Sequence, residues 1–197
     1  MQMKRKPKFG QNFLVDDAAR HAIVDALGDI SKRTVIEIGP GHGAITETLA
    51  GRCRRLIALE LDRALAAELT FRFRDQPQVQ IIEGDVLKAE FGTGYDIAIL
   101  GHILHTEGEE RSGKLLAKVL RALKSGGTIA IGEWLVNDRR TGPVPSLIFA
   151  VNMLVHSERG DAFSFNEIKS WLQQAGFKKV RKLQAPGPSP LILATKA

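Results

Sequence analysis

The sequence predicts one doubly wound α/β domain with a seven-stranded, mostly parallel sheet. Short apolar runs rich in β-branched residues alternate with segments of helical periodicity along most of the 197 residues. A glycine-rich loop follows the first of these runs, where a doubly wound sheet binds its ligand. The last two runs are joined by a short segment containing Pro186, Gly187 and Pro188. Parallel strands need a longer crossover, so we expect one antiparallel strand at or near an edge of the sheet.

The individual elements are predicted from hydrophobic periodicity and from start and stop signals. Asp16 is a good N-cap for a helix over 17–27, and Gly28 is placed to end it. Strands are expected at 34–38, 55–61, 78–83, 95–100, 128–135, 177–183 and 190–195, with further helices at 44–51, 64–73, 107–123, 146–155 and 165–175. Residues 125–127 are expected to form a turn. The helix at 146–155 is apolar on nearly every side, so we expect all its faces to be buried, in the core, under a substrate lid or in a dimer.

Composition fits a globular protein and indicates no leader sequence. Hydrophobic residues make up 44% and charged residues 25% of the chain, and the single cysteine, Cys53, excludes an internal disulfide and fits a reducing cytosol. The N-terminus is basic at Lys4, Arg5, Lys6 and Lys8, but no apolar signal core follows it. The longest apolar stretch is too short to span a bilayer. We therefore expect a cytoplasmic protein without membrane association, whose basic N-terminus either attracts RNA phosphates or is simply solvated.

Three consecutive predicted strands end in residues suited to binding a nucleoside-containing cofactor. The loop after the first contains Gly39, Gly41 and Gly43, a spacing that differs from both the dinucleotide fingerprint and the phosphate-binding P-loop. Glu60 ends the second strand, where an acid can accept hydrogen bonds from ribose hydroxyls. Asp85 ends the third and could accept a bond from an adenine amino group. The alternative is that these acids only form turns or begin helices.

This constellation resembles the class I, Rossmann-like, S-adenosyl-L-methionine-dependent methyltransferases. The shared features are E-x-G-x-G-x-G from Glu37 to Gly43, the acid after the second strand and the Gly-Asp after the third. The resemblance implies S-adenosyl-L-methionine as cofactor and S-adenosyl-L-homocysteine as its product. It also implies a binding role for each matching position: the methionine part is faced by Glu37, Gly39, Gly41 and Gly43, the ribose by Glu60 with Leu61, and the adenine by Asp85 with Val86.

The first ninety or so residues resemble the ribosomal RNA adenine dimethyltransferases. The resemblance is carried by Lys8-Phe9-Gly10-Gln11-Asn12-Phe13-Leu14, by Glu37-Ile38-Gly39-Pro40-Gly41 and by Glu83-Gly84-Asp85-Val86-Leu87. It implies that Gln11, Asn12 and Leu14 wrap the cofactor. The chain departs from that branch after the fourth strand, where Leu100-Gly101-His102-Ile103-Leu104-His105 replaces an Asn-(Leu/Ile)-Pro-Tyr type motif that holds a flipped base. The small helical RNA-binding domain of that branch is also not expected here.

Residues 95–197 instead resemble small-molecule O-methyltransferases. The matching segments are Ile103-Leu104-His105, Leu123-Lys124-Ser125-Gly126-Gly127, Ile131-Gly132-Glu133, Asn152-Met153-Leu154 and Ala175-Gly176-Phe177. The resemblance implies that His105 is the general base that deprotonates a hydroxyl and that Glu133 orients it. The second orienting acid of that family falls at Ala162, next to Asp161. The N-terminal dimerisation domain of those enzymes is not expected here.

Several residues have a structural alternative to the functional role. His105 could simply precede a helix, because Thr106 and Glu109 form a capping-box pattern. We expect His102 to be a wall residue and Arg139 and Arg140 to be solvated. No metal site is expected.

The sequence therefore predicts a basic segment and helix over 1–30 and a methyltransferase domain over 31–197, with a cofactor half (31–90) and an acceptor half (95–197). The favoured function is O-methyl transfer to a small hydroxylated aromatic acceptor. One alternative is an RNA adenine N6-methyltransferase-like protein that uses the basic N-terminus. Another is a cofactor-binding hybrid, natural or made, without an evolved substrate. A homodimer remains open.

Overall fold

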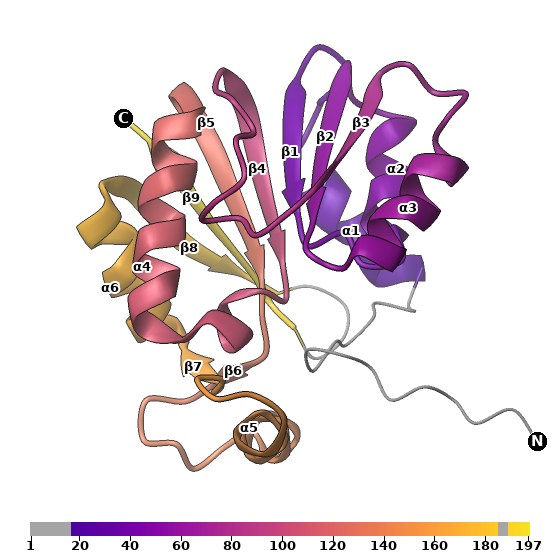
Figure 1. Ribbon diagram of the computed structural model, residues 1–197. Coiled ribbons are helices and arrows are strands. Elements are labelled where there is room, and N and C mark those ends of the chain that lie inside the picture. Colours follow the sequence, from indigo (N-terminus) through magenta and orange to yellow (C-terminus); the bar gives the residue numbers. More distant parts are fainter. Residues whose placement is uncertain (1–16, 185–188) are drawn as a thin grey trace, which may run out of the picture.

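The computed structural model describes residues 17–184 and 189–197 and confirms the predicted α/β class. Its main sheet has seven strands in the order β3-β2-β1-β4-β5-β9-β8 (Figure 1). The strands are β1 (Thr34–Ile38), β2 (Arg55–Glu60), β3 (Val79–Glu83), β4 (Tyr95–Gly101), β5 (Leu123–Gly132), β8 (Phe177–Leu183) and β9 (Leu191–Lys196). The helices are α1 (Asp17–Asp25), α2 (Ala44–Ala50), α3 (Arg63–Arg72), α4 (Leu104–Ala122), α5 (Val144–His156) and α6 (Phe165–Ala175).

The sheet is parallel except at β9. Strand β1 pairs in parallel with β2 and β4, with Ile36 opposite Ile57 on one side and Ala98 on the other. Strand β9 is antiparallel to both β5 and β8, and it lies next to the edge strand β8. This arrangement confirms the antiparallel strand expected near an edge. It follows from the short connection between β8 and β9, which leaves no room for a helical crossover.

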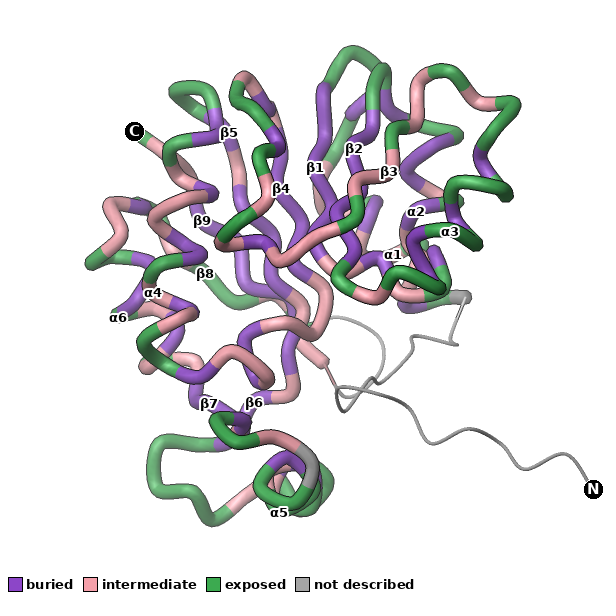
Figure 2. Tube along the Cα trace, in the orientation of Figure 1, coloured by how far each residue is buried: buried purple, intermediate pink, exposed green. Residues whose placement is uncertain are grey.

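Helices cover the sheet on both faces, so the central strands are buried on both sides. On one face Val24, Leu49 and Leu69 bring α1, α2 and α3 against the sheet. On the other face Leu116 and Trp171 do the same for α4 and α6. All five residues of β1 are buried, as the purple course of the central strands shows in Figure 2. Such continuous burial explains why the strands are runs of Val, Ile and Leu instead of alternating patterns.

Among the boundaries that differ from the prediction, the starts of α4 and β5 lie three and five residues earlier, because tertiary packing extends these elements. Helix α4 begins at Leu104 instead of 107, and it bends at Gly108, which has φ 71° and ψ 173°. Strand β5 begins at Leu123 instead of 128, so the expected turn at 125–127 lies inside the strand. The pairing of β5 with β4 changes register between Leu123 and Thr128, and Gly126 has φ 73° there. The glycines that suggested a turn therefore form an irregularity in the strand.

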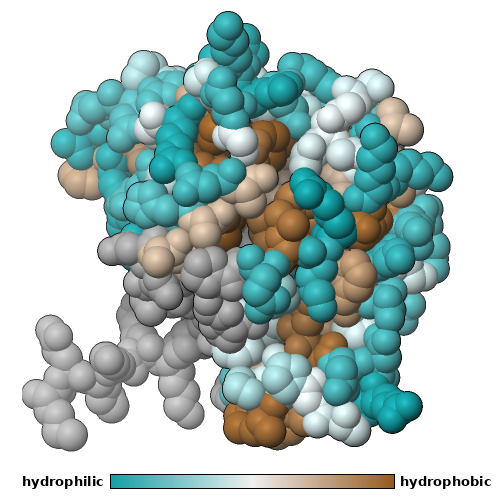
Figure 3. Space-filling view, turned by 180° about the vertical axis from the view of Figure 1, so that it is seen from behind, coloured by the Kyte–Doolittle hydropathy of each residue, from teal (hydrophilic) through white to brown (hydrophobic). Residues whose placement is uncertain are grey.

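A small additional layer lies beyond the carboxyl end of β5. Strands β6 (Leu135–Val136) and β7 (Phe163–Ser164), which the sequence analysis did not predict, pair in parallel and frame α5. The inner side of α5 is buried through Phe149 and Met153. Its outer side is exposed in the single chain, which excludes burial in the core on every face, while the lid and dimer alternatives stay predictions. Figure 3 shows hydrophobic side chains gathered there, and the exposed residues are Val144, Ile148, Val151, Leu154 and Val155.

Within the described part of the chain, no helix is long and apolar enough to cross a membrane.

Candidate active site

The glycine loop between β1 and α2 has a backbone that only glycine adopts easily. Gly39, Gly41 and Gly43 have φ values of 75°, 58° and 79°. A Cβ atom at Gly39 would lie 2.3 Å from Ile103 Cδ1, and one at Gly43 would lie 2.7 Å from Leu69 Cδ2. The glycines therefore let the loop approach the start of α4 and the side of α3.

Glu37 lies below this loop as a buried acid. It is 3% exposed, and its Oε2 accepts a hydrogen bond of 2.8 Å from Thr46 Oγ1. Burial raises the pKa of Glu37 to about 7, and the nearby Glu60 adds to the rise. The bond to Thr46 opposes this shift and ties β1 to α2. Glu37 thus holds the shape of the loop, and its charge depends on pH near neutrality.

Glu60, predicted to bind a ribose, lies at the end of β2 with both oxygens directed at backbone amides. Its Oε2 accepts from Gly41 N at 3.0 Å, and its Oε1 accepts from Asp62 N at 2.8 Å. Burial raises the pKa of Glu60, and the backbone hydrogen bonds oppose that rise. A carboxylate offers about four lone-pair sites, so two remain for hydroxyl donors. The acid and the glycine loop therefore form one unit that fits a ribose.

Asp85, predicted to read adenine, is held by a cation that the sequence analysis did not single out. Its Oδ1 accepts from Leu87 N at 2.8 Å, and Arg111 Nη2 lies 3.3 and 3.2 Å from its two oxygens. Partial burial alone would raise the pKa of Asp85, but these hydrogen bonds and the guanidinium charge lower it. Arg111 also donates to Glu107. Asp85 is thus an ionised acceptor, which fits an adenine amino group.

The remaining cofactor predictions have different outcomes. Leu61 is exposed next to Glu60, whereas Val86 is buried in the cluster that packs under α4 and α6. Gln11, Asn12 and Leu14 lie outside the described residues, as do the N-cap Asp16 and the basic residues of the N-terminus. The structure therefore brings the glycines, Glu60 and Asp85 together along the carboxyl ends of β1, β2 and β3. The chemistry of this donor and acceptor set fits S-adenosylmethionine.

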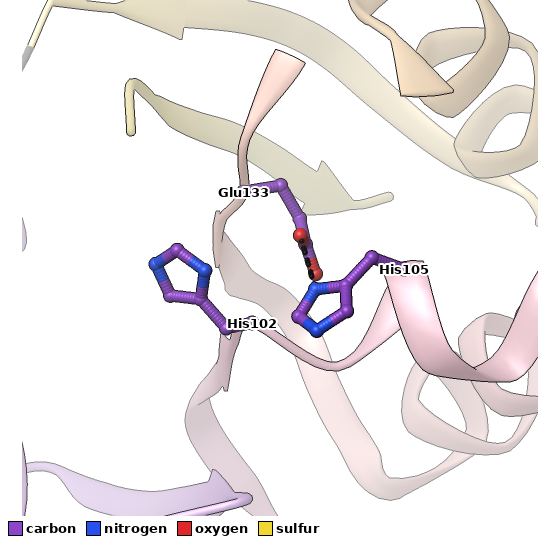
Figure 4. A group of neighbouring side chains, drawn as sticks. All are labelled: His102, His105 and Glu133. Carbon is purple, nitrogen blue, oxygen red and sulfur yellow. Dashed lines mark hydrogen bonds and ion pairs between the residues drawn. The ribbon is translucent and has the colours of Figure 1, made fainter. Parts of the chain in front are cut away.

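His105 and Glu133 form a buried pair at the carboxyl ends of β4 and β5. Each side chain is 2% exposed, and His105 Nδ1 lies 2.9 Å from Glu133 Oε2 (Figure 4). The other oxygen of Glu133 accepts from Leu104 N at 2.8 Å. Complete burial would raise the pKa of Glu133, but His105, His102 and the Leu104 amide outweigh burial and lower it. A carboxylate can only accept, so Nδ1 of His105 carries a proton, and in the neutral ring Nε2 then holds the lone pair.

The backbone around His105 is fixed by two glycines and one amide. Asp161 N donates to His105 O at 3.0 Å, and a Cβ at Gly160 would lie 2.9 Å from the same oxygen. The bend at Gly108 lets Arg159 pack closely, since a Cβ there would lie 3.0 Å from Arg159 O. His105 thus lies inside the first turn of α4, so the alternative that it merely precedes the helix is wrong.

The capping-box alternative also fails at Thr106, whose hydroxyl donates backwards to Ile103 O at 2.8 Å.

The position of the second orienting acid is apolar. Ala162 is fully buried with Val136, Phe149 and Met153. The neighbouring Asp161 turns its carboxylate to Arg140 at 3.0 Å. Arg140 also donates to Ala162 O and Glu167 Oε1, each at 3.0 Å, so it clamps the loops around α5 and is not simply solvated as expected. Among the described residues Glu133 is therefore the acid that orients His105.

Aromatic rings surround the pair. Phe149 from α5 meets the His105 ring edge-on, with centroids 4.9 Å apart, and Trp134 stacks on Phe149 at 5.5 Å. His102 contacts His105 from the other side, with centroids 6.0 Å apart. Aromatic and apolar neighbours around a polar group are typical of sites that bind a flat ring.

Four functional residues escaped the sequence analysis: Thr46, Arg111, Trp134 and Phe149. Thr46 follows the last glycine of the loop by three residues, and Arg111 lies one helical turn after Glu107. These spacings can be seen in the sequence. The partner of Thr46 is Glu37 and that of Arg111 is Asp85, and both partners lie on other elements. Phe149 and Trp134 gave no local signal, because only the packing of α5 brings Phe149 against both His105 and Trp134.

Comparison with known proteins gives two overlapping likenesses. The ribosomal RNA small subunit methyltransferase A of Acidobacterium capsulatum is 52% identical over 104 residues, which are 51% of this chain and 37% of that protein. The 3-hydroxy-5-methyl-1-naphthoate 3-O-methyltransferase of Streptomyces sahachiroi is 32% identical over 180 residues, covering 84% of this chain and 49% of that protein. The chain thus spans less than half the length of either relative.

A solved structure described as PigF with SAH superposes with a TM-score of 0.80 at 26% identity, covering 91% of this chain and 55% of that one. The model of the family described as ribosomal RNA adenine dimethylase matches residues 2–126, which runs past residue 90 and through α4. The chain therefore belongs to the ribosomal RNA adenine dimethylase family and carries the class I, S-adenosylmethionine-dependent methyltransferase fold.

Proposed function

We propose that this chain transfers a methyl group from S-adenosylmethionine to a hydroxyl of a small aromatic acceptor. The observation that carries the proposal is the buried His105–Glu133 pair, with 2.9 Å between His105 Nδ1 and Glu133 Oε2, at the sheet edge where Glu60 and Asp85 also lie. A histidine in that tautomer has a free Nε2 lone pair. That lone pair can accept a proton from a hydroxyl.

When bound, S-adenosylmethionine supplies an activated methyl group on a sulfonium. The protein then has two tasks, which are to align the acceptor and to remove its proton. In the proposal His105 Nε2 takes the hydroxyl proton, and the ionised Glu133 stabilises the imidazolium that results. Phe149 and Trp134 hold the ring of the acceptor beside that nitrogen. Glu37, Glu60, Asp85 and the glycine loop hold the cofactor.

The likeness to the naphthoate O-methyltransferase supports this choice of acceptor, because it extends over 84% of this chain and reaches both halves. The same likeness weakens the alternative that the chain is a cofactor-binding hybrid without an evolved substrate. A chain assembled from unrelated halves would match one relative only on one side of the junction.

Methylation of RNA is the second candidate, and a specific observation favours it. The family model and the closely similar methyltransferase of Acidobacterium capsulatum both point to ribosomal RNA. Against it stands the segment after β4, where Gly101-His102-Ile103-Leu104 lies at the place of the Asn-Pro-Tyr type motif. Deleting residues 1–8 tests this candidate, which expects a large, salt-dependent loss of RNA binding.

A homodimer remains a prediction, and the exposed apolar side of α5 is its candidate surface. Light scattering of the purified protein measures its oligomeric state directly.

The experiment that tests the favoured function is the His105→Ala substitution. We expect kcat for methyl transfer to a phenol to fall by about 10²–10⁴-fold, the usual range for losing a general base. The dissociation constant for S-adenosylmethionine, measured by calorimetry, should change little. His21→Ala, an exposed position on α1, is the matched control. Transfer that survives in His105→Ala would remove the proposed base.

A further inference from the structure

His102 is a histidine that the proposed chemistry does not use. It follows the last residue of β4 with φ 55°, a left-handed conformation that is uncommon for a residue with a side chain. Its Nδ1 atom is buried, and within the described ranges it has no hydrogen-bond partner. A buried polar atom without a partner carries a cost, and such atoms and strained conformations concentrate at functional sites.

The unpartnered nitrogen belongs to a cluster of metal-binding side chains. His102, His105 and Glu133 each offer one ligand atom, and these atoms lie within 4.8 Å of one another. Figure 4 shows a ring nitrogen of His102 facing the Glu133–His105 pair. Two imidazoles and one carboxylate form a ligand set that binds zinc and leaves a fourth position open.

We propose that His102, His105 and Glu133 bind a divalent ion of the zinc class and that this ion switches off methyl transfer. The binding part stands on the cluster alone, and the switch rests on the proposed function. Ligands of tetrahedral zinc are about 3.3 Å apart at Zn–N and Zn–O distances of about 2.0–2.1 Å. The widest gap between ligand atoms must therefore close by no more than about 1.5 Å. This proposal replaces the expectation that the chain has no metal site.

The switch follows from the chemistry of one imidazole. An ion on Nδ1 of His105 takes the place of the proton that Nδ1 donates to Glu133. The single proton of the neutral ring then lies on Nε2, which can no longer accept one from a hydroxyl. The ion also occupies the carboxylate that orients the ring. Binding and base catalysis therefore exclude each other at this site.

Binding is tested on the whole chain without cofactor or acceptor. We expect one Zn²⁺ per chain in competition with a chromophoric chelator, and Co²⁺ should give the intense visible bands of a low-symmetry, four- or five-coordinate site. His102→Asn should weaken Zn²⁺ binding at least tenfold, and Asn tolerates the left-handed backbone. His21→Asn is the control. Equal affinity in wild type and His102→Asn, or no stoichiometric site, would overturn the proposal.

The switch is tested with the acceptor that the protein methylates. Zn²⁺ should abolish transfer at the concentration that fills the site, and a chelator should restore it. Relative to its own rate without zinc, His102→Asn should need at least a tenfold higher Zn²⁺ concentration for half-inhibition than the wild type. Zinc that binds without inhibiting would disprove the switch. If no acceptor is methylated, the proposed function fails, while the chelator and Co²⁺ measurements still decide whether the ion site exists.

Discussion

At the residue scale, the buried acids show how one fold gives carboxylates different charges. Glu37 has one hydroxyl partner and a raised pKa, whereas Glu133 has an imidazole and an amide and a lowered pKa. Both are fully enclosed, so their partners decide the difference. Only Glu133 is therefore suited to stabilise an imidazolium at neutral pH.

Glu37 should make the stability of the protein depend on pH. Its pKa is about 7 in the folded chain against 4.5 ordinarily. The folded state then holds a proton that the unfolded state loses, so the contribution of Glu37 to stability is fully present below pH 4.5 and is lost as pH rises through 7. The loss amounts to about 3 kcal/mol. Glu37→Gln cannot ionise, so it lacks this pH-dependent contribution to stability. Its amide oxygen can still accept the hydrogen bond from the Thr46 hydroxyl.

Chemical denaturation of both proteins without cofactor measures the effect. The free energy of unfolding of the wild type minus that of Glu37→Gln should fall between pH 5 and pH 8. Other titrating groups are common to the two proteins and cancel in the difference. A difference that stays constant over this range would contradict the raised pKa.

At the element scale, packing decided what sequence patterns could not. The strands β1, β2 and β4 were predictable because burial on both faces requires continuous apolar runs. The start of α4 at Leu104 was not, since it depends on Glu133 of β5 accepting from the Leu104 amide. Strands β6 and β7 have two residues each and exist only by pairing with each other. The exposed side of α5 also depends on packing. Composition shows that a helix face is apolar, but it does not show whether another element covers that face.

The contact between the glycine loop and α4 predicts the effect of Gly39→Ala. An alanine there meets Ile103 at 2.3 Å and also adopts φ 75°. Gly92 is the matched control, because it has φ 78° but nothing within 4 Å of an added Cβ. We expect Gly92→Ala to cost about 1–2 kcal/mol from the backbone alone. Gly39→Ala should cost more and should weaken cofactor binding.

Denaturant titration gives the two stabilities, and calorimetry gives the affinity for S-adenosylmethionine. Adding Ile103→Ala to Gly39→Ala should recover part of the lost stability by removing the clash. Equal costs at Gly39 and Gly92 would show that the loop does not press against α4.

At the scale of the whole molecule, the two halves that resemble different methyltransferases share one sheet. Strands β1 and β4 come from the cofactor half and the acceptor half, and they pair in the centre over four residues from Val35↔Ile97 to Ile38↔Leu100. The cluster under α4 and α6 likewise contains Ile57 and Leu172. The sequence indicated two likenesses, but only the structure shows that they share one core.

This continuity predicts a single cooperative unfolding transition. Both tryptophans, Trp134 and Trp171, lie in the acceptor half, whereas far-ultraviolet circular dichroism reports on the whole chain. The two signals should change at the same denaturant concentration. Tryptophan fluorescence that changes at a separate midpoint would mean that the halves unfold independently, as expected of a loosely joined hybrid.

Core packing gives a second prediction at this scale. Phe177 at the start of β8 is fully buried, while Phe71 on α3 is 69% exposed. Phe177→Ala should cost about 3–5 kcal/mol of unfolding free energy. Phe71→Ala should cost less than about 0.5 kcal/mol. Denaturant midpoints with unchanged slopes measure both, and comparable costs would place β8 outside the main core.

The most direct test of the central claim is transfer of labelled methyl from S-adenosylmethionine into two acceptor pools. One pool holds mixed phenols and catechols, and the other holds unmodified ribosomal RNA. The His105–Glu133 pair predicts label in the phenol pool, lost on His105→Ala. Label in the RNA alone would contradict the proposed acceptor and make the family likeness of residues 2–126 the guide to function. Label in neither pool would equally contradict transfer to a phenolic hydroxyl.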